Sequence, residues 1–546
     1  MPETSAVRVQ PGARMETPLC RLAQALAGLM GWRRYATVFL LGAVLAAALP
    51  LPPIGGLPPM NFSLLIFVSF PGLLWLDEGS VSPWASARLG YVFGLGFFVA
   101  GLYWIAAALF VDIAAFWWAL PFALLGVPAL LAFFTAAALL VTAVGSARLR
   151  LSASARVCLF AVAWCAAEWG RGHVLTGLPW NLVGYVWSGG FPGALAVLQT
   201  TAWVGIYGLS LVTVLAAALP SLLGTPSLFP IPGLRRAAPA IAAALLILVP
   251  AAAGGIRLHL LPSGSTGIWL RLVQPSISEK LKWDPAAAEQ NLQRLMKLSA
   301  APSNHALAAI LWPEAAVPFL LERDDARRSA ITAILPKDGY LITGALRANP
   351  PPAAVSQIWN SVEAVDAQGG IRATYDKAHL VPFGEYVPFS DVLPMKKITP
   401  GAIDISAGPG PRSLNLLGLP SFSPIVCYEA IFPSGIVDRE NRPDWILNVT
   451  NDAWYGHSSG PYQHFAIART RAVEQGLPLV RAANNGVSGV VDAAGRVIAG
   501  MDLDTIGYLD VVLPAAAGAT PYAIVGDWIF LAMMLLALVP VVGRLR

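Results

Sequence analysis

Three side chains in the second half of the chain have the types that acyl-transfer chemistry needs. Glu314 follows an apolar run, Lys377 follows a short strand-like segment, and Cys427 ends a further apolar run. A thiol where a strand meets a helix lies near helix amides, which lower its pKa and favour the thiolate. A carboxylate can take the thiol proton, and a lysine can stabilise the oxyanion that forms on a substrate carbonyl. Spacing alone leaves structural roles open for all three residues. Glu314 could be a carboxylate at a helix start, Lys377 a surface charge, and Cys427 a buried hydrophobic residue.

The elements that must position these residues are short strands and helices. Two helix-like stretches are predicted at 285–298, with Asp284 and Pro285 as N-cap and first turn, and at 462–475, bracketed by Pro461 and Gly476. Turn residues predict hairpins at 366–370 and 492–495. Strands alternating with helices favour an α/β layered domain. The apolar runs that predict strands are 268–273, 308–312, 340–345, 361–365, 371–374, 423–426 and 445–449.

Composition divides the chain into a membrane block and a soluble domain. Hydrophobic residues make up 56% of the chain and charged residues 12%, where a soluble domain carries about 25% charged residues. Mean hydropathy is +0.62. Residues 36–255 hold 11 charged residues, whereas residues 256–520 hold 46. These values exclude a single soluble globule, a disordered chain and a disulfide-rich scaffold.

Eight apolar stretches are candidates for membrane spans, which need about 20 residues each. They are 36–51, 61–76, 87–111, 113–144, 157–170, 198–223, 238–254 and 525–542. We therefore expect a cytoplasmic tail at 1–35, a multi-span α-helical membrane domain of about seven helices at 36–255, a soluble domain at 256–523, and a last helix with a short cytoplasmic tail at 524–546.

Arginine positions predict the orientation of these spans. With the N-terminus in the cytoplasm, the loops that return to the cytoplasm carry most of the arginines, and the short loops on the opposite side carry only Arg171. This is the positive-inside pattern, and it places residues 256–523 outside the cytoplasm. The arginines on the cytoplasmic side are Arg8, Arg14, Arg21, Arg33, Arg34, Arg88, Arg148, Arg150, Arg156, Arg235, Arg236, Arg544 and Arg546.

Charge and cysteine usage narrow the classes of partner. The net charge of +5 is too diffuse for nucleic-acid binding, which needs a clustered basic face. Cys427 is the only cysteine of the soluble domain, so it cannot form a disulfide within that domain. It is either an inert buried residue or a free functional thiol. No cysteine and histidine spacing typical of zinc is present, and no metal or organic cofactor is expected.

Several motifs resemble a known family. Trp312-Pro313-Glu314, Tyr375-Asp376-Lys377 and Cys427-Tyr428-Glu429 are similar to the three signatures of the nitrilase superfamily, in the same chain order. Longer segments resemble the apolipoprotein N-acyltransferases, the membrane-embedded branch of that superfamily, from about residue 36 to the end of the chain. These segments are Glu168-Trp-Gly-Arg171, Thr176-Gly-Leu-Pro-Trp180, Lys377-Ala-His-Leu-Val-Pro-Phe-Gly-Glu-Tyr-Val-Pro-Phe389, Asn448-Val-Thr-Asn-Asp-Ala-Trp-Tyr-Gly456 and Arg481-Ala-Ala-Asn-Asn-Gly486.

The resemblance implies an αββα sandwich for the soluble domain and a set of site residues. Cys427 would be the nucleophile, Glu314 the general base, and Lys377 the group that stabilises the tetrahedral intermediate. The resemblance also implies supporting or substrate-binding roles: Glu385 supports the site, Tyr428 and Glu429 shape the pocket, Trp283 touches substrate from a mobile loop, and Trp180 lines the membrane-side entrance.

The implied reaction is ping-pong acyl transfer in a bacterial inner membrane, with the catalytic domain facing the periplasm. Cys427 would take an acyl chain from a membrane phospholipid and pass it to the N-terminal amine of a diacylated apolipoprotein. Loops near Trp283 and at 383–388 are expected to restrict water, because hydrolysis of the thioester competes with transfer. The membrane lipids surround the enzyme, and a membrane anchor is expected to keep it monomeric.

Two other functions stay open at this point. A membrane-tethered amidase would use the same three residues but pass the acyl group to water, and it gives no reason for so many spans. A transporter would need ionisable groups at mid-bilayer depth, whereas Asp77, Glu78, Asp112 and Glu168 lie at or near span ends. The tryptophans Trp169, Trp180 and Trp187 could instead be interfacial anchors, and Glu168 could simply pair with Arg171. His457 and His464 are not expected to be catalytic, and the asparagines near the site are expected to satisfy turns.

Overall fold

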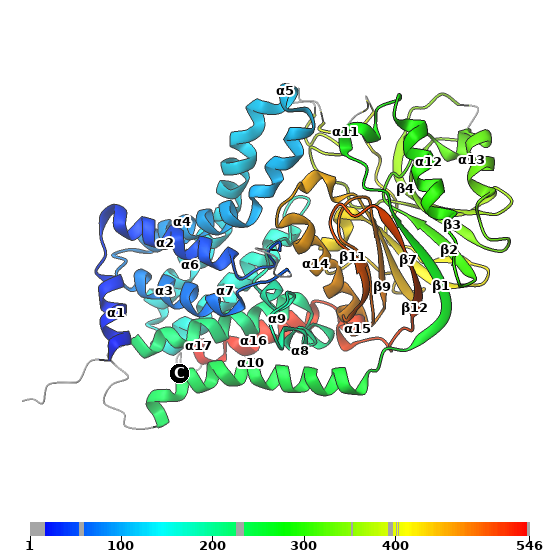
Figure 1. Ribbon diagram of the computed structural model, residues 1–546. Helices are drawn as coiled ribbons and strands as arrows, with labels where there is room; N and C mark the ends of the chain where they lie inside the picture. The colour runs from blue at the N-terminus through cyan, green and yellow to red at the C-terminus, as the bar shows by residue number, and fades with distance from the viewer. Residues whose placement is uncertain are drawn as a thin grey trace, which may run out of the picture.

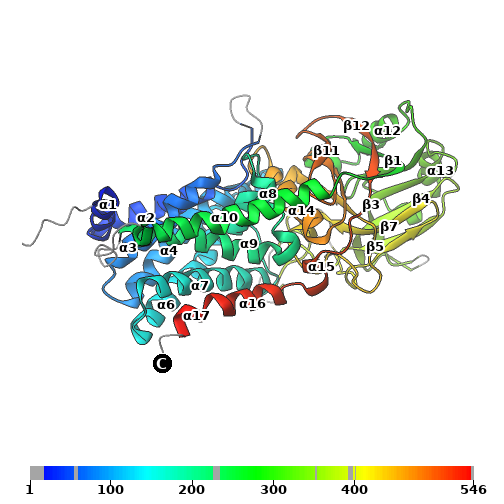
Figure 2. The same ribbon diagram turned by 90° about the horizontal axis from the view of Figure 1, so that it is seen from below.

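A helical bundle and a two-sheet sandwich lie side by side in the molecule (Figure 1). The computed structural model describes residues 17–53, 59–224, 234–350, 353–390, 397–399, 401 and 403–542. Arg8, Arg14, Arg544 and Arg546, which support the predicted orientation, lie outside these residues. The sandwich follows α10 (Leu234–Leu260) and precedes α15 (Pro521–Val525), so both of its ends connect to the bundle. Helix α10 runs along the lower edge of the bundle in Figure 1, and the C-terminal helices run along its lower edge in Figure 2.

Helices overlap all eight stretches that hydropathy singles out. Four helical stretches among the described residues are long and apolar enough to cross a membrane: Pro83–Ala119, Phe122–Leu149, Thr201–Gly224 and Ala237–Leu260. The helices of the bundle are α1 (Pro18–Ala27), α2 (Gly31–Ala46), α3 (Ile66–Glu78), α4 (Pro83–Leu102), α5 (Ile113–Phe116), α6 (Val127–Leu149), α7 (Ala153–His173), α8 (Ala194–Leu198), α9 (Thr201–Ala218), α10, α15, α16 (Trp528–Ala537) and α17 (Val539–Val542). How many of them cross the membrane stays a prediction.

One helix boundary differs from the break between apolar stretches that hydropathy predicts at residue 112. Residues 113–119 continue the third helical stretch instead of opening the fourth, through the 3-10 segments η2 (Tyr103–Asp112) and η3 (Trp117–Ala119) around α5. These segments form an arm that rises from the bundle beside the sandwich (Figure 1). Hydropathy cannot place this boundary, because residues 103–126 are almost uniformly apolar.

Local sequence explains how the bundle helices begin and how closely they pack. Ser82 and Ser152 cap α4 and α7 by accepting the N–H groups of Ala85 and Ala155. Gly96 of α4 lies against the backbone of α2, where a Cβ would stand 2.1 Å from the carbonyl oxygen of Phe39. Small residues of this kind let membrane helices approach each other closely.

The sandwich consists of two six-stranded sheets with helices on their outer faces, which confirms the expected αββα layers. The first sheet has the order β12-β1-β2-β3-β4-β5, and the second has the order β11-β10-β9-β8-β7-β6. The strands are β1 (Ser265–Gln274), β2 (Leu307–Trp312), β3 (Tyr340–Ala348), β4 (Ile358–Asp366), β5 (Ile371–Asp376), β6 (Leu414–Leu416), β7 (Leu419–Val426), β8 (Trp445–Thr450), β9 (Leu479–Ala483), β10 (Ser488–Val491), β11 (Val497–Met501) and β12 (Gly507–Pro514).

Three apolar layers hold the sandwich together. Residues such as Leu311, Val362 and Phe422 fill the space between the sheets. Helices α12 (Ala288–Ser299) and α13 (Asp325–Thr332) cover the first sheet, and α14 (Gly460–Gln475) covers the second. Every strand and hairpin predicted from the sequence is present. The start of α12 is three residues later than predicted, because Asp284 accepts the N–H of Ala286 in a preceding turn instead of capping the helix.

Strand direction brings the ends of β2, β5 and β7 to one edge of the sandwich. Strands β1, β2 and β3 are parallel to one another, as are β7, β8 and β9. Strand β5 is antiparallel to β4, which is antiparallel to β3, so β5 runs in the direction of β2. The C-terminal ends of β2 and β5 therefore lie at the same edge of the first sheet, and the charges of Glu314 and Lys377, which follow these strands, act on Cys427, which follows β7 of the second sheet.

Candidate active site

Glu314 is held in a buried turn directly after β2. Its carboxylate Oε1 accepts a hydrogen bond of 2.8 Å from Nδ2 of Asn360. The turn packs on β3 at Gly344, where a Cβ would stand 2.5 Å from Cα of Glu314. Burial raises the pKa of Glu314, although the nearby charge of Lys377 acts in the opposite direction. A carboxylate with a raised pKa is a stronger base than an exposed one.

Lys377, which follows β5, lies between two carboxylates. Its Nζ is 2.9 Å from Oε2 of Glu385 and 3.7 Å from Oε1 of Glu314. Burial opposes the charge of the lysine, but Glu385 and Glu314 outweigh this and raise the pKa of Lys377. Asn360 joins the two carboxylates, because its Nδ2 also donates to Oε1 of Glu385 at 2.9 Å. The lysine is therefore a fixed positive charge on a rigid support.

Cys427 is a buried thiol in a strained backbone conformation. It follows β7 directly and begins the 3-10 turn η9 (Cys427–Ile431) with a φ of 48°, a left-handed value that a residue with a side chain adopts only under constraint. Burial, reinforced by the charge of Glu314 and opposed by Lys377, raises the pKa of Cys427 to about 12. This corrects the expected depression of the thiol pKa. The turn has only five residues, and desolvation of the sulfur outweighs its amides.

Glu429 ties the nucleophile turn to the segment that carries the lysine. Its Oε1 accepts the hydroxyl of Tyr375 and the N–H of Ala378, both at 2.8 Å, while its Oε2 accepts the N–H of Val426 at 2.7 Å. The residue is 5% exposed. This one carboxylate therefore holds the turn that contains Cys427 at a fixed distance from the backbone that follows Lys377.

A loop of the bundle docks onto the nucleophile turn. The hydroxyl of Tyr428 donates to the carbonyl of Gly177 at 2.9 Å, and Nε2 of His379 donates to the carbonyl of Thr176 at 2.7 Å. Trp180, at the end of the same loop, donates from Nε1 to Oε1 of Gln463 on α14 at 2.8 Å. Trp180 is 1% exposed, so it is enclosed between the bundle and the sandwich, and its role at a membrane-side entrance stays a prediction.

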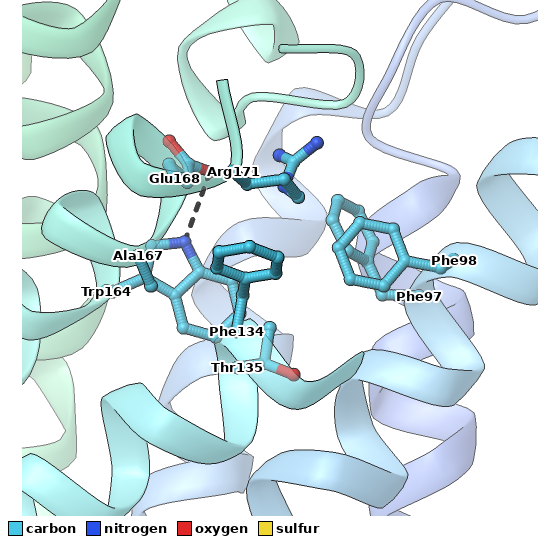
Figure 3. Close-up of a pocket in the computed structure, with 8 residues that line it drawn as sticks. All are labelled: Phe97, Phe98, Phe134, Thr135, Trp164, Ala167, Glu168 and Arg171. Carbon is cyan, nitrogen blue, oxygen red and sulfur yellow. Dashed lines mark hydrogen bonds between the residues drawn. The ribbon is translucent and has the colours of Figure 1, made fainter. Parts of the chain in front are cut away.

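Arg171 and Glu168 lie beside a small cavity within the bundle (Figure 3), and both also bond to the loop that contacts the nucleophile turn. Nη1 of Arg171 donates to the carbonyls of Leu178 and Trp180, both at 2.6 Å. Oε1 of Glu168 accepts the N–H of Val183 at 2.9 Å and the indole N–H of Trp164 at 3.2 Å, and its carboxylate forms no ion pair with Arg171 among the described residues. The cavity beside them measures about 10 Å³, which is room for one water molecule and not for a substrate.

Trp283 follows the short helix α11 (Glu279–Lys282), which lies over the carboxylate site. Its Nε1 donates to Oε1 of Glu279 at 2.6 Å. Nζ of Lys282 donates to the backbone carbonyl of Glu314 at 2.9 Å. The helix is therefore attached directly to the chain that carries Glu314.

The structure brings Glu314, Lys377, Glu385, Tyr428, Glu429 and Cys427 into one buried site. Sequence reasoning missed Asn360 and Lys282, which contact Glu314 directly. Lys282 stands beside Trp283 in the sequence, and that adjacency is the only signal that could have found it. Nothing in the sequence distinguishes Asn360 from the other asparagines. Among the described residues, no group of three or more histidine, cysteine, aspartate or glutamate side chains is arranged to hold a metal ion.

Comparisons with known proteins cover both halves of the chain. Residues 54–219 match the model of the apolipoprotein N-acyltransferase N-terminal domain, and residues 270–522 match the model of the carbon-nitrogen hydrolases. An apolipoprotein N-acyltransferase of Rhodopseudomonas palustris is 39% identical, over 97% of this chain and 98% of its own length. One of Bradyrhizobium diazoefficiens is 40% identical, over 93% of this chain and 94% of its own length. A crystal structure of an amidase from Nesterenkonia sp. is 23% identical with a TM-score of 0.34, over 47% of this chain and 93% of the amidase.

Proposed function

The chain belongs to the apolipoprotein N-acyltransferase family, and from this membership we propose that it moves a fatty acyl chain from a membrane phospholipid to the N-terminal amine of a diacylglyceryl-cysteine on an apolipoprotein. It is an integral membrane acyltransferase of the nitrilase superfamily. Both substrates keep their acyl chains in the bilayer, so confinement to the membrane supplies proximity that a dissolved enzyme lacks. The observation that carries the proposal is a thiol, a carboxylate and a lysine buried together where the sandwich meets the bundle.

In the first half-reaction, the thiol of Cys427 attacks the ester carbonyl of the phospholipid. Glu314 takes the thiol proton as the carbon–sulfur bond forms, which is necessary because a thiol with a pKa of about 12 supplies little thiolate near neutral pH. Lys377 stabilises the oxyanion. When the carbon–oxygen bond breaks, Glu314 returns the proton to the departing lysophospholipid, and the acyl chain remains on sulfur as a thioester.

The second half-reaction reverses these roles. The acceptor amine attacks the thioester carbonyl and gives up one proton to Glu314 as the amide bond forms. The carbon–sulfur bond then breaks, and Glu314 returns that proton to Cys427. No proton is gained or lost over the cycle. Glu385 holds Lys377. On this proposal Trp283, which follows α11, and Phe383 contact the acyl chains.

The arginine pattern supports an orientation in a bacterial inner membrane with the sandwich in the periplasm. On this proposal residues 36–255 and 524–546 form the membrane domain with its cytoplasmic end, and residues 256–523 form the periplasmic catalytic domain. The chain would act as a monomer.

Intact-protein mass spectrometry tests the proposal. The detergent-purified enzyme is incubated with phospholipid, and Cys427→Ala is run alongside. A fatty-acyl mass increment on the native chain alone, removed by neutral hydroxylamine and cleared by a diacylated lipopeptide, is the expected result. Release of free fatty acid at the same rate without the lipopeptide would instead identify a hydrolase. An adduct on Cys427→Ala would exclude the proposed nucleophile.

A further inference from the structure

A buried histidine holds the backbone of the nucleophile turn. His464, on α14, is fully buried, and its Nε2 lies 3.0 Å from the carbonyl oxygen of Cys427. A carbonyl oxygen only accepts, so Nε2 donates its N–H to it. The contact is to the backbone of Cys427 and not to its thiol. Because Nε2 already carries a hydrogen, it cannot also accept the proton of the Cys427 thiol.

The opposite side of the ring is fixed by two charged residues that follow or belong to neighbouring strands. Nδ1 of His464 is 2.9 Å from Oδ1 of Asp452, which follows β8, and 3.1 Å from Nη2 of Arg481 on β9. Asp452 and Arg481 form an ion pair of 2.7 Å with both side chains fully buried. Burial, together with the charge of Arg481, lowers the pKa of His464, although the carboxylate of Asp452 acts in the opposite direction.

Aromatic rings close the space around the histidine. The ring of Trp180, from the docked loop of the bundle, is centred 5.5 Å from that of His464, and the ring of Tyr455 is centred 5.6 Å away. Neither the helix nor the ring can move without disturbing both halves of the molecule. The position of Nε2 is therefore fixed by the second sheet and by the bundle together.

The peptide that this hydrogen bond restrains determines the geometry of the nucleophile. Cys427 has a positive φ, a strained conformation that persists only where surrounding contacts enforce it. The peptide unit is planar, so fixing the carbonyl of Cys427 also fixes the N–H of Tyr428 on the opposite side of the same plane. One hydrogen bond thus orients both the residue that bears the thiol and the next amide.

We propose that His464 is a positioning residue that keeps the nucleophile turn in its reactive geometry through the carbonyl of Cys427. The inference rests on the proposed role of Cys427 as nucleophile. His464 does not touch substrate and moves no proton. The hydrogen bond from His464 raises the rate of thioester formation and does not change the binding of phospholipid.

Three substitutions of His464 in the full-length enzyme test the contacts of Nε2 and of Nδ1 separately. In His464→Gln the amide nitrogen can occupy the place of Nε2 and donate to Cys427. In His464→Asn the amide can occupy only the place of Nδ1, beside Asp452 and Arg481. His464→Leu removes both contacts at similar volume. The measurement is the rate constant of thioester formation at saturating phospholipid, by intact mass, together with KM for the donor and the midpoint of thermal unfolding.

The expected result is a loss of about a hundredfold in the rate constant for His464→Leu and His464→Asn, the size that small misplacements of reacting groups produce, with KM within about twofold. His464→Gln should recover most of the rate. A native rate in His464→Leu would overturn the proposal, as would recovery by His464→Asn but not by His464→Gln. If the leucine variant does not fold, a His464→Gln variant that folds but reacts as slowly as His464→Asn would also overturn it.

A parallel Cys427→Ala sample keeps this outcome distinct from failure of the proposed function. If Cys427→Ala still transfers acyl groups, the nucleophile assignment fails whatever the histidine variants show. If Cys427→Ala is inactive and His464→Leu reacts at the native rate, only the positioning role of His464 fails.

Discussion

Two carboxylates share one lysine beside the thiol, and this charge balance decides how the site reacts. With Glu314 and Glu385 ionised and Lys377 protonated, the three side chains carry one net negative charge. Transfer of the thiol proton to Glu314 moves that charge to the sulfur and then to the oxyanion, next to Lys377. Because the site is buried, the attraction to the lysine is weakly screened. Lys377 therefore stays close to the negative charge as it moves from the carboxylate to the sulfur and the oxyanion.

Glu314→Gln should stop formation of the thioester. The amide cannot take the thiol proton, and it keeps the size and much of the hydrogen bonding of the carboxylate, so the fold should survive. We expect the rate of adduct formation to fall by about 10²–10⁴-fold, the usual contribution of a general base. Intact mass spectrometry over time provides the rate, and the thermal unfolding midpoint provides the control. Adduct accumulation at the native rate would remove Glu314 from the mechanism.

The pH dependence of acylation follows from the directions of the two pKa shifts. Glu314 acts only when ionised, and burial raises its pKa, so the rate should fall as the pH drops through that raised value. Above it the rate should stay level to about pH 10, because Cys427, with a pKa of about 12, gains little thiolate in that range. Single-turnover acylation at a series of pH values checks this. A rate that rises about tenfold per pH unit above about pH 8 would show attack by free thiolate instead.

At the scale of single elements, the contact between β3 and the turn after β2 controls where Glu314 stands. Gly344→Ala would place a Cβ 2.5 Å from Cα of Glu314 and 2.6 Å from the carbonyl of Pro313, so the turn must move. We expect acyl transfer to fall by at least about tenfold, with a lower unfolding midpoint. Gly518→Ala is the matched control, since a Cβ at Gly518 meets nothing within 4 Å. Equal activities of the two variants would show that the turn tolerates displacement.

Seven of the twelve strands among the described residues were predictable from the sequence, because each of the seven is a short apolar run, whereas β6, β9, β10, β11 and β12 were not predicted. The three signature motifs also placed Glu314, Lys377 and Cys427 at the correct strand ends. Asn360 was not predictable, since its role depends on β4 lying between the strands that precede Lys377 and Glu314, which is a matter of sheet order. The raised pKa of Cys427 was missed for a related reason. Burial of the sulfur raises this pKa, and the extent of burial depends on how the layers assemble and not on the local sequence.

At the scale of the whole molecule, the bundle supports the chemistry in addition to anchoring it. The loop that Arg171 holds reaches the nucleophile turn through Tyr428 and packs on α14 through Trp180. The sequence indicated two blocks and their order. The direct contact of the motif around Arg171 with the catalytic turn could not be inferred, because hydropathy describes how a helix meets lipid and not which loop meets which domain.

The orientation of the whole molecule can be tested by labelling single cysteines in intact cells. Leu417, in the turn between β6 and β7, is 91% exposed, and Ser154, at the start of α7, is exposed beside the arginines of a predicted cytoplasmic loop. A membrane-impermeant maleimide should label Leu417→Cys in bacterial spheroplasts and should label Ser154→Cys only after the membrane is permeabilised. The unsubstituted chain, in which Cys20, Cys165 and Cys427 are buried and Cys158 is half-buried, sets the background. The arginine asymmetry predicts this result, since lysine- and arginine-rich short loops remain in the cytoplasm. Labelling of Ser154→Cys before permeabilisation, with Leu417→Cys protected, would place the catalytic domain in the cytoplasm and invert the topology.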